Sequence, residues 1–286
     1  MRLIDANQPD VNGNRVTFPQ YGFVHELTPI SNSTYHAFQS TLRIQGWAGI
    51  SGFAAYTWSK SLDDASDGID FVASAALPQD STNLKAEHGP STFDTRHRFT
   101  AALNYKLPVW SALPKRVASG WQLNWIWTAQ SGRPLPIVTN NDTSALPNDN
   151  FNTRSFFHQR PNAVPGANPI QPHWTPNGYV YSSAAAFAQP DNGTFGNLGR
   201  DAVYGPSYWN ADFSINKDTA ISDRVGVQIR AELFNIFNHP NFALPNSTFG
   251  TDAFGLITQT PDVAQGNPGL GGGGPRVIQL GLKVVF

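Results

Sequence analysis

Apolar and polar residues alternate along seven stretches of this chain, and the clearest of them lies at the C-terminus. A period of two residues places successive side chains on opposite faces of a β-strand. From Ile278 to Phe286 every second residue is apolar, whereas the residues between them are mixed. The pattern predicts seven strands, at Tyr35–Ile44, Ile50–Lys60, Arg98–Leu107, Gly120–Gln130, Tyr208–Thr219, Val225–Phe237 and Pro275–Phe286.

One face of these strands is apolar and rich in aromatic residues. In the fourth strand Trp121, Trp125 and Trp127 all fall on the same side. Three tryptophans on one face are unusual for a sheet that faces water. They are typical of a face that contacts either lipid acyl chains or a large protein core. We predict that the lipid-facing residues are Trp121, Trp125, Trp127, Phe213, Ile229, Leu280, Leu282, Val284 and Phe286.

The opposite face is polar in the last two strands, where Arg230 and Glu232 should lie beside Gln279 and Lys283. A polar ladder that faces water or a plug is the simpler interpretation, and contact with a substrate is the alternative. The alternation of the sixth strand slips near Leu233-Phe234, where we expect a β-bulge. The predicted lumen-lining residues are Gln228, Arg230, Glu232, Gln279 and Lys283.

The connections between the predicted strands alternate in length. The short ones lie near residues 45–49, 108–118 and 220–224, and the others are long and rich in Asn, Pro and Gly. Bacterial outer-membrane barrels have short periplasmic turns and long outer loops, whereas soluble sandwiches have no reason to sort loop lengths by end. We therefore expect an all-β, antiparallel up-and-down meander that forms part of a barrel.

Composition narrows the possible functions. Charged residues make up 14 % of the chain, and a net charge of −1 gives no electrostatic footprint for nucleic acid. Aromatic residues make up 12 %, as interfacial girdles require. The chain has no cysteine and no apolar run long enough for a spanning helix, so a membrane assignment rests on strands. Its first residues lack a secretory signal, so for a barrel protein we expect the true N-terminus to be missing.

No catalytic or cofactor-binding constellation emerges from the sequence. The histidines are scattered and no nucleophile motif occurs, so we expect neither an enzyme nor a bound cofactor. Asp63, Asp64, Asp67 and Asp70 offer oxygen ligands for Ca²⁺, but their spacing does not match an EF-hand loop. A solvated outer loop is the simpler interpretation of these aspartates.

Six segments in order resemble the C-terminal barrel region of TonB-dependent outer-membrane receptors, especially the Oar-like branch, over roughly residues 30–286. The last segment also resembles the C-terminal signal read by the barrel-assembly machinery, through Gln279, Gly281, Val284 and Phe286. The six segments are YTWSKSLDD (56–64), DTRHRF (94–99), GWQLNWIWTAQSGRP (120–134), NADFSINKD (210–218), RAELFNIFNHPNF (230–242) and PRVIQLGLKVVF (275–286).

The resemblance implies an outer-membrane transporter that imports an unidentified ligand and is driven by the TonB complex. A complete member would have an N-terminal plug and a barrel of about 22 strands. Seven strands without a plug predict that residues 1–286 are a C-terminal fragment, and that the TonB complex acts through the missing N-terminal part. The alternative hypothesis is a secreted β-sandwich that binds carbohydrate through its tryptophan-rich faces.

Overall fold

The computed structural model describes residues 2–10, 14–22, 24–66, 78–109, 112, 114–140, 159–266 and 272–286. Seven long strands form one antiparallel meander, in which each strand pairs with its neighbours along the chain. The predicted all-β, up-and-down architecture is therefore confirmed. The strands are β3 (Ser33–Trp47), β4 (Ile50–Asp63), β6 (His97–Lys106), β7 (Trp121–Gln130), β15 (Tyr208–Ala220), β16 (Gly226–Phe234) and β19 (Val277–Val285).

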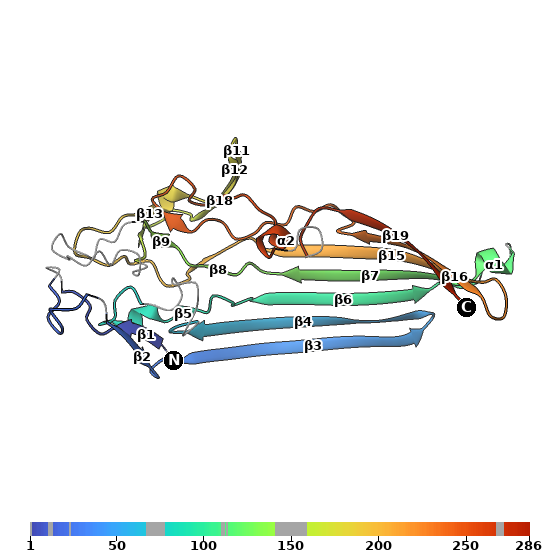
Figure 1. Cartoon of the computed structure of the whole chain (residues 1–286), viewed down its shortest axis with the longest axis horizontal. Coiled ribbons are helices and arrows are strands. Elements are labelled where there is room, and N and C mark those ends of the chain that lie inside the picture. Colours follow the sequence, from blue (N-terminus) through green and yellow to red (C-terminus); the bar gives the residue numbers. More distant parts are fainter. Residues whose placement is uncertain are drawn as a thin grey trace.

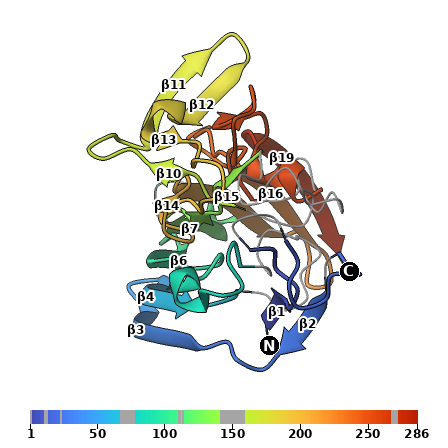
Figure 2. The ribbon, with the colours of Figure 1, turned by 90° about the vertical axis from the view of Figure 1, so that its left-hand side faces the viewer.

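The meander curves into an open trough instead of closing into a barrel (Figures 1 and 2). Strands β3 and β19 form its two edges, and neither pairs with the other or with a further long strand of the described chain. The segment that carries β1 (Arg2–Asp5) and β2 (His25–Thr28) lies on the inner side of the curve in Figure 2.

The short connections all lie at one end of the trough, together with the C-terminus (Figure 1). We refer to this end as the turn end and to the opposite end as the loop end. Between β3 and β4, Ala48 and Gly49 have φ angles of 51° and 82°, as a two-residue hairpin turn requires. The connection before β7 holds the single helical turn α1 (Lys115–Ala118). The predicted sorting of connections by length is therefore present.

Pairing is more regular near Phe234 than the sequence pattern suggested. The β16–β19 ladder runs without a register shift through Leu233 and Phe234, and the β15–β16 ladder does so as far as Leu233, so the predicted bulge at these residues is wrong. The alternation fails there because the strand ends, and Asn235 turns the chain with a φ of 47°. A register shift occurs instead between Ile44 and Trp47, before the first hairpin turn.

Short strands and helical turns fill the long connections at the loop end (Figure 1). They form five small sheets: β1–β2, β10–β13, β11–β12–β18, β14–β8 and β17–β9, of which the last is parallel. A further short strand, β5 (Gly89–Pro90), pairs with β4. The other bounds are η1 (Leu84–Glu87), β8 (Pro134–Leu135), β9 (Val138–Thr139), β10 (Asn162–Ala163), β11 (Ile170–Thr175), β12 (Gly178–Ser182), η3 (Ala184–Ala186), β13 (Phe187–Ala188), β14 (Val203–Tyr204), β17 (Thr248–Phe249), β18 (Leu256–Ile257) and α2 (Pro261–Ala264).

The main buried apolar cluster lies among these loop-end segments and not against the long strands. Its members are Leu135, Ile137, Ala186, Phe187, Leu198, Val203 and Phe254.

The apolar side of the long strands is instead open, and Leu280 and Leu282 are 78 % and 72 % exposed. A sandwich would seal such residues against a second sheet, so the sandwich alternative is excluded. The α-helices in the described part of the chain, α1 and α2, have four residues each and are too short to span a bilayer.

The packing of the loop end includes close backbone contacts, and a substitution at Gly132 tests one of them. A Cβ atom at Gly132 would lie 1.8 Å from the carbonyl oxygen of Gly205, whereas a Cβ at Gly226 meets nothing closer than 3.9 Å. We expect Gly132→Ala to lower the free energy of unfolding by about 1–3 kcal/mol, because the backbone must move. The matched Gly226→Ala should change it by less than about 0.5 kcal/mol. Urea unfolding of the refolded chain in detergent micelles measures both, and equal effects would contradict this packing.

Candidate functional site

Cross-strand rows organise the apolar face of the trough. In one row Leu103 pairs with Trp125 and Trp125 pairs with Phe213, which in turn lies opposite Leu233, the partner of Ile278. The ring centroids of Trp125 and Phe213 are 5.5 Å apart. Strand parity places Trp121, Trp125, Trp127, Phe213, Ile229, Leu280, Leu282 and Val284 on this face, and Phe286, which follows β19, is 96 % exposed.

Aromatic residues gather toward both ends of this face. Trp58 and Trp127 lie toward the loop end, and Trp47 and Trp121 toward the turn end. The ten residues of β7 extend about 33 Å, or about 25 Å across a layer when tilted by about 40°. This height and the paired aromatic belts match the apolar band of a membrane barrel.

Lys217 is a cation on the apolar face that the sequence analysis missed. It pairs with Trp121 and Ile229, and its side chain is largely buried. The Nζ atom donates to the carbonyl oxygens of Arg116, at 2.9 Å, and of Ser119, and it lies 5.6 Å from the Trp121 ring centroid. The long side chain thus carries its charge to backbone acceptors at the turn end, where a membrane boundary would lie.

The other face carries a hydrogen-bonded polar ladder. Asn104 donates to Asn124 Oδ1 over 2.5 Å, and Asn124 donates to Ser214 Oγ over 2.9 Å, which links β6, β7 and β15. Ser214 then pairs with Glu232, and Glu232 with Gln279. The hydrogen bonds thus join the first three of these residues, and the strand register continues the polar row to Glu232 and Gln279. The same face also carries apolar residues, among them Phe53 and Ile126.

All five predicted lumen-lining residues lie together on this polar face. Gln228 pairs with Lys283, and Glu232 pairs with Gln279. Arg230 lies between Gln228 and Glu232, and a nitrogen of Arg230 is 3.8 Å from a carboxylate oxygen of Glu232. The structure therefore brings these side chains into one patch, and their contact with a lumen or a substrate stays a prediction.

Comparison with protein families decides what this two-faced sheet is. Residues 2–279 match the family model of the outer membrane beta barrel domain. The chain belongs to the outer-membrane β-barrel family. It is accordingly a protein of the bacterial outer membrane, where strands turn apolar side chains to lipid and polar ones to the lumen. Searches of curated proteins and of solved structures gave no match.

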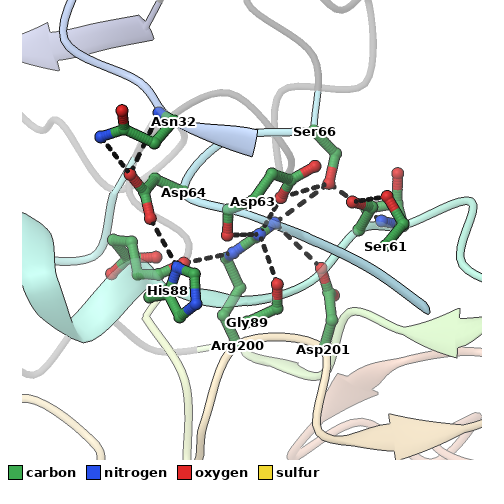
Figure 3. Close-up of polar contacts among 12 residues, drawn as sticks. Asn32, Ser61, Asp63, Asp64, Ser66, His88, Gly89, Arg200 and Asp201 are labelled. Carbon is green, nitrogen blue, oxygen red and sulfur yellow. Dashed lines mark hydrogen bonds and ion pairs between the residues drawn. The ribbon is translucent and has the colours of Figure 1, made fainter. Parts of the chain in front are cut away.

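A buried ionic cluster locks the loop-end segments of the barrel domain onto β4 (Figure 3). Arg200 forms ion pairs with Asp63, at the end of β4, and with Asp201, whose Oδ2 lies 3.1 Å from Arg200 Nη1. Arg200 also donates to the backbone oxygens of Glu87 and Asp63, each over 2.6 Å. One guanidinium thus joins segments more than 100 residues apart, which no sequence spacing reveals.

Two further arginines extend this cluster. Arg160 donates to Glu87 over 2.7 Å, and both side chains are buried. Arg2 is buried nearby, where desolvation lowers the pKa of its guanidinium. The Arg160–Glu87 ion pair fixes the segment that begins at residue 159 to η1 at the loop end.

Two of the four aspartates considered as calcium ligands, Asp63 and Asp64, have other partners. Asp63 faces Arg200, and Asp64 accepts hydrogen bonds from Asn32 and lies 2.9 Å from His88 Nδ1. Asp67 and Asp70 lie outside the described residues. No cluster of metal ligands occurs in the described part of the chain.

A cleft of about 650 Å³ opens at the loop end between the wall and the 242–265 segment. Gln130 and Tyr208 reach it from the polar face, and Arg133, Asn246 and Gln259 line it from the loops. Its volume falls within the range of small-molecule sites. This cleft lies where the polar face of the wall meets the loops of the loop end.

The ionisation of Asp201 should govern the stability of the ionic cluster. Burial raises the pKa of this carboxyl to about 6, against the opposing charge of Arg200. Because the folded state then holds its proton more tightly than the unfolded state, stability should fall as the pH rises from about 4 to about 6. A shift of about two pKa units corresponds to roughly 3 kcal/mol.

Asp201→Asn removes this ionisation and keeps an oxygen acceptor for Arg200. The variant should therefore gain roughly 3 kcal/mol over wild type between pH 4 and pH 7, measured by urea unfolding at each pH. Asp191→Asn, at an exposed site in the same connection, is the matched control and should gain nothing comparable. An identical pH dependence of wild type and Asp201→Asn would contradict this role.

Proposed function

We propose that this chain forms the C-terminal part of the barrel of a TonB-dependent outer-membrane transporter, which imports an unidentified ligand through its lumen. The observation that carries the proposal is the open trough (Figure 2), which has one polar face and an unpaired strand at each edge. Membrane-spanning strands need partners on both sides, because hydrocarbon offers their backbone groups no hydrogen bonds. Further strands must therefore complete the wall.

A wide barrel fits the contents of the trough better than a narrow one. The interior of an eight-stranded barrel has room for side chains or one small ligand only. Here backbone segments occupy the inner side at the loop end, where Arg160 and Arg200 form ion pairs with buried carboxylates. Transporters of about 22 strands have a lumen wide enough to hold a plug and such loops.

The lengths of the connections give the orientation of the wall. Short connections belong in the periplasm, so the turn end and Phe286 lie there and the loop end faces outward. The polar ladder from Asn104 to Gln279 then lines the passage, and the 650 Å³ cleft lies at its outer mouth. In this arrangement the ligand meets the cleft first and the ladder second.

The proposed partners follow from the same arrangement. The apolar face contacts outer-membrane lipid, and Gln279, Gly281, Val284 and Phe286 on the exposed edge strand present the signal to the barrel-assembly machinery. The TonB complex acts through an N-terminal part of the parent protein. We propose no enzymatic reaction and no cofactor for this chain.

The DNA upstream of codon 1 tests the proposal. We expect the same reading frame to continue upstream and to encode a plug domain and further strands with a period of two. An in-frame stop codon immediately upstream, together with a ribosome-binding site, would contradict it. For the parent protein, deletion of the TonB gene should abolish import while leaving the protein in the outer membrane.

A further inference from the structure

A groove of about 470 Å³ lies on the apolar face near the loop end. Its floor is Ala129, whose cross-strand partners are Phe99 on β6 and Trp209 on β15. Trp127 lies on the same face, two residues along β7, with ring centroids 6.3 Å from Phe99 and 6.4 Å from Trp209. One small residue among three large rings leaves a depression in this part of the wall.

The groove has a polar rim at its loop end. Tyr56 and His97 line it, and the Tyr56 hydroxyl lies 2.8 Å from His97 Nδ1. If the hydroxyl donates to Nδ1, a neutral imidazole carries its proton on Nε2. If Nδ1 donates, the hydroxyl hydrogen is free. In either tautomer this pair keeps one N–H or O–H donor that its own hydrogen bond does not use.

The surroundings of the groove indicate its occupant. It is continuous with the face that the family places against lipid, and it lies near the aromatic belt of the loop end. In the orientation proposed above, the loop end contacts the outer leaflet, whose lipid in this membrane is lipopolysaccharide. An apolar groove with a hydrogen-bond donor at its rim suits an acyl chain followed by an ester or amide oxygen.

We propose that this groove holds one acyl chain of the lipid A part of lipopolysaccharide. The chain lies over Ala129 between the rings of Phe99 and Trp209, and the oxygen next to it accepts a hydrogen bond from the Tyr56–His97 pair. The proposal rests on the orientation given under the proposed function but not on transport, so a missing plug would leave it intact.

Native mass spectrometry of the full chain in detergent micelles tests the proposal, with purified lipid A and phosphatidylethanolamine as the two probes. We expect one bound lipid A per chain, and weaker binding of phosphatidylethanolamine. No adduct, or a preference for phosphatidylethanolamine, would overturn the proposal.

Two variants locate the adduct. Ala129→Trp fills the groove and should abolish it, whereas Ala231→Trp makes the same change on the same face of β16, away from the groove, and should retain it. Equal retention by both variants would overturn the proposal.

A third variant keeps the test decisive if Ala129→Trp does not fold. The double substitution Tyr56→Phe and His97→Phe preserves the apolar lining and removes the donors of the rim. Loss of one net hydrogen bond should weaken lipid A binding about 5- to 10-fold. Unchanged affinity in a variant with wild-type circular dichroism would overturn the assigned role of the pair.

Discussion

A strand that crosses hydrocarbon must pair its backbone N–H and C=O groups with other strands, because no water is there to replace them. The continuous ladders from β3 to β19 meet this requirement at every internal strand of the meander. The two edges, β3 and β19, do not meet it, and this is why we propose that the trough is a section of a larger wall. The pairing also decides which side chains share a face. Because the ladders are regular, every second residue of each strand lies beside every second residue of its neighbour, so one face is mainly apolar and the other mainly polar.

Charged residues that depart from this two-faced pattern lie at the ends of the strands, where polar partners surround them. Lys217 breaks the apolar face only at the turn end, where backbone carbonyls and the Trp121 ring accept its charge. Buried charges are concentrated at the loop end, beyond the apolar band, where Arg200 and Arg160 neutralise Asp63 and Glu87. The wall is therefore held by strand pairing, and the loop end by ionic contacts and a small apolar cluster.

The sequence predicted the wall well because alternation is a local signal. It located all seven strands, and for β7 and β19 it gave the bounds to within two residues. It failed at Leu233-Phe234, where the end of a strand and a bulge disturb the period in the same way. Contacts between distant segments, such as Arg200 with Asp63, cannot be predicted from a local sequence pattern. The same holds for the groove over Ala129, because its lining comes from several strands.

Labelling of single cysteines in membranes tests most directly whether the apolar face meets lipid. The chain has no native cysteine, so each introduced thiol reports one position. Ile229 and Leu282 pair across β16 and β19, and Arg230 and Lys283 follow them on the opposite face. A membrane-impermeant maleimide should label cysteines at Arg230 and Lys283 and spare those at Ile229 and Leu282. Equal labelling of all four positions, or the reverse pattern, would contradict the account.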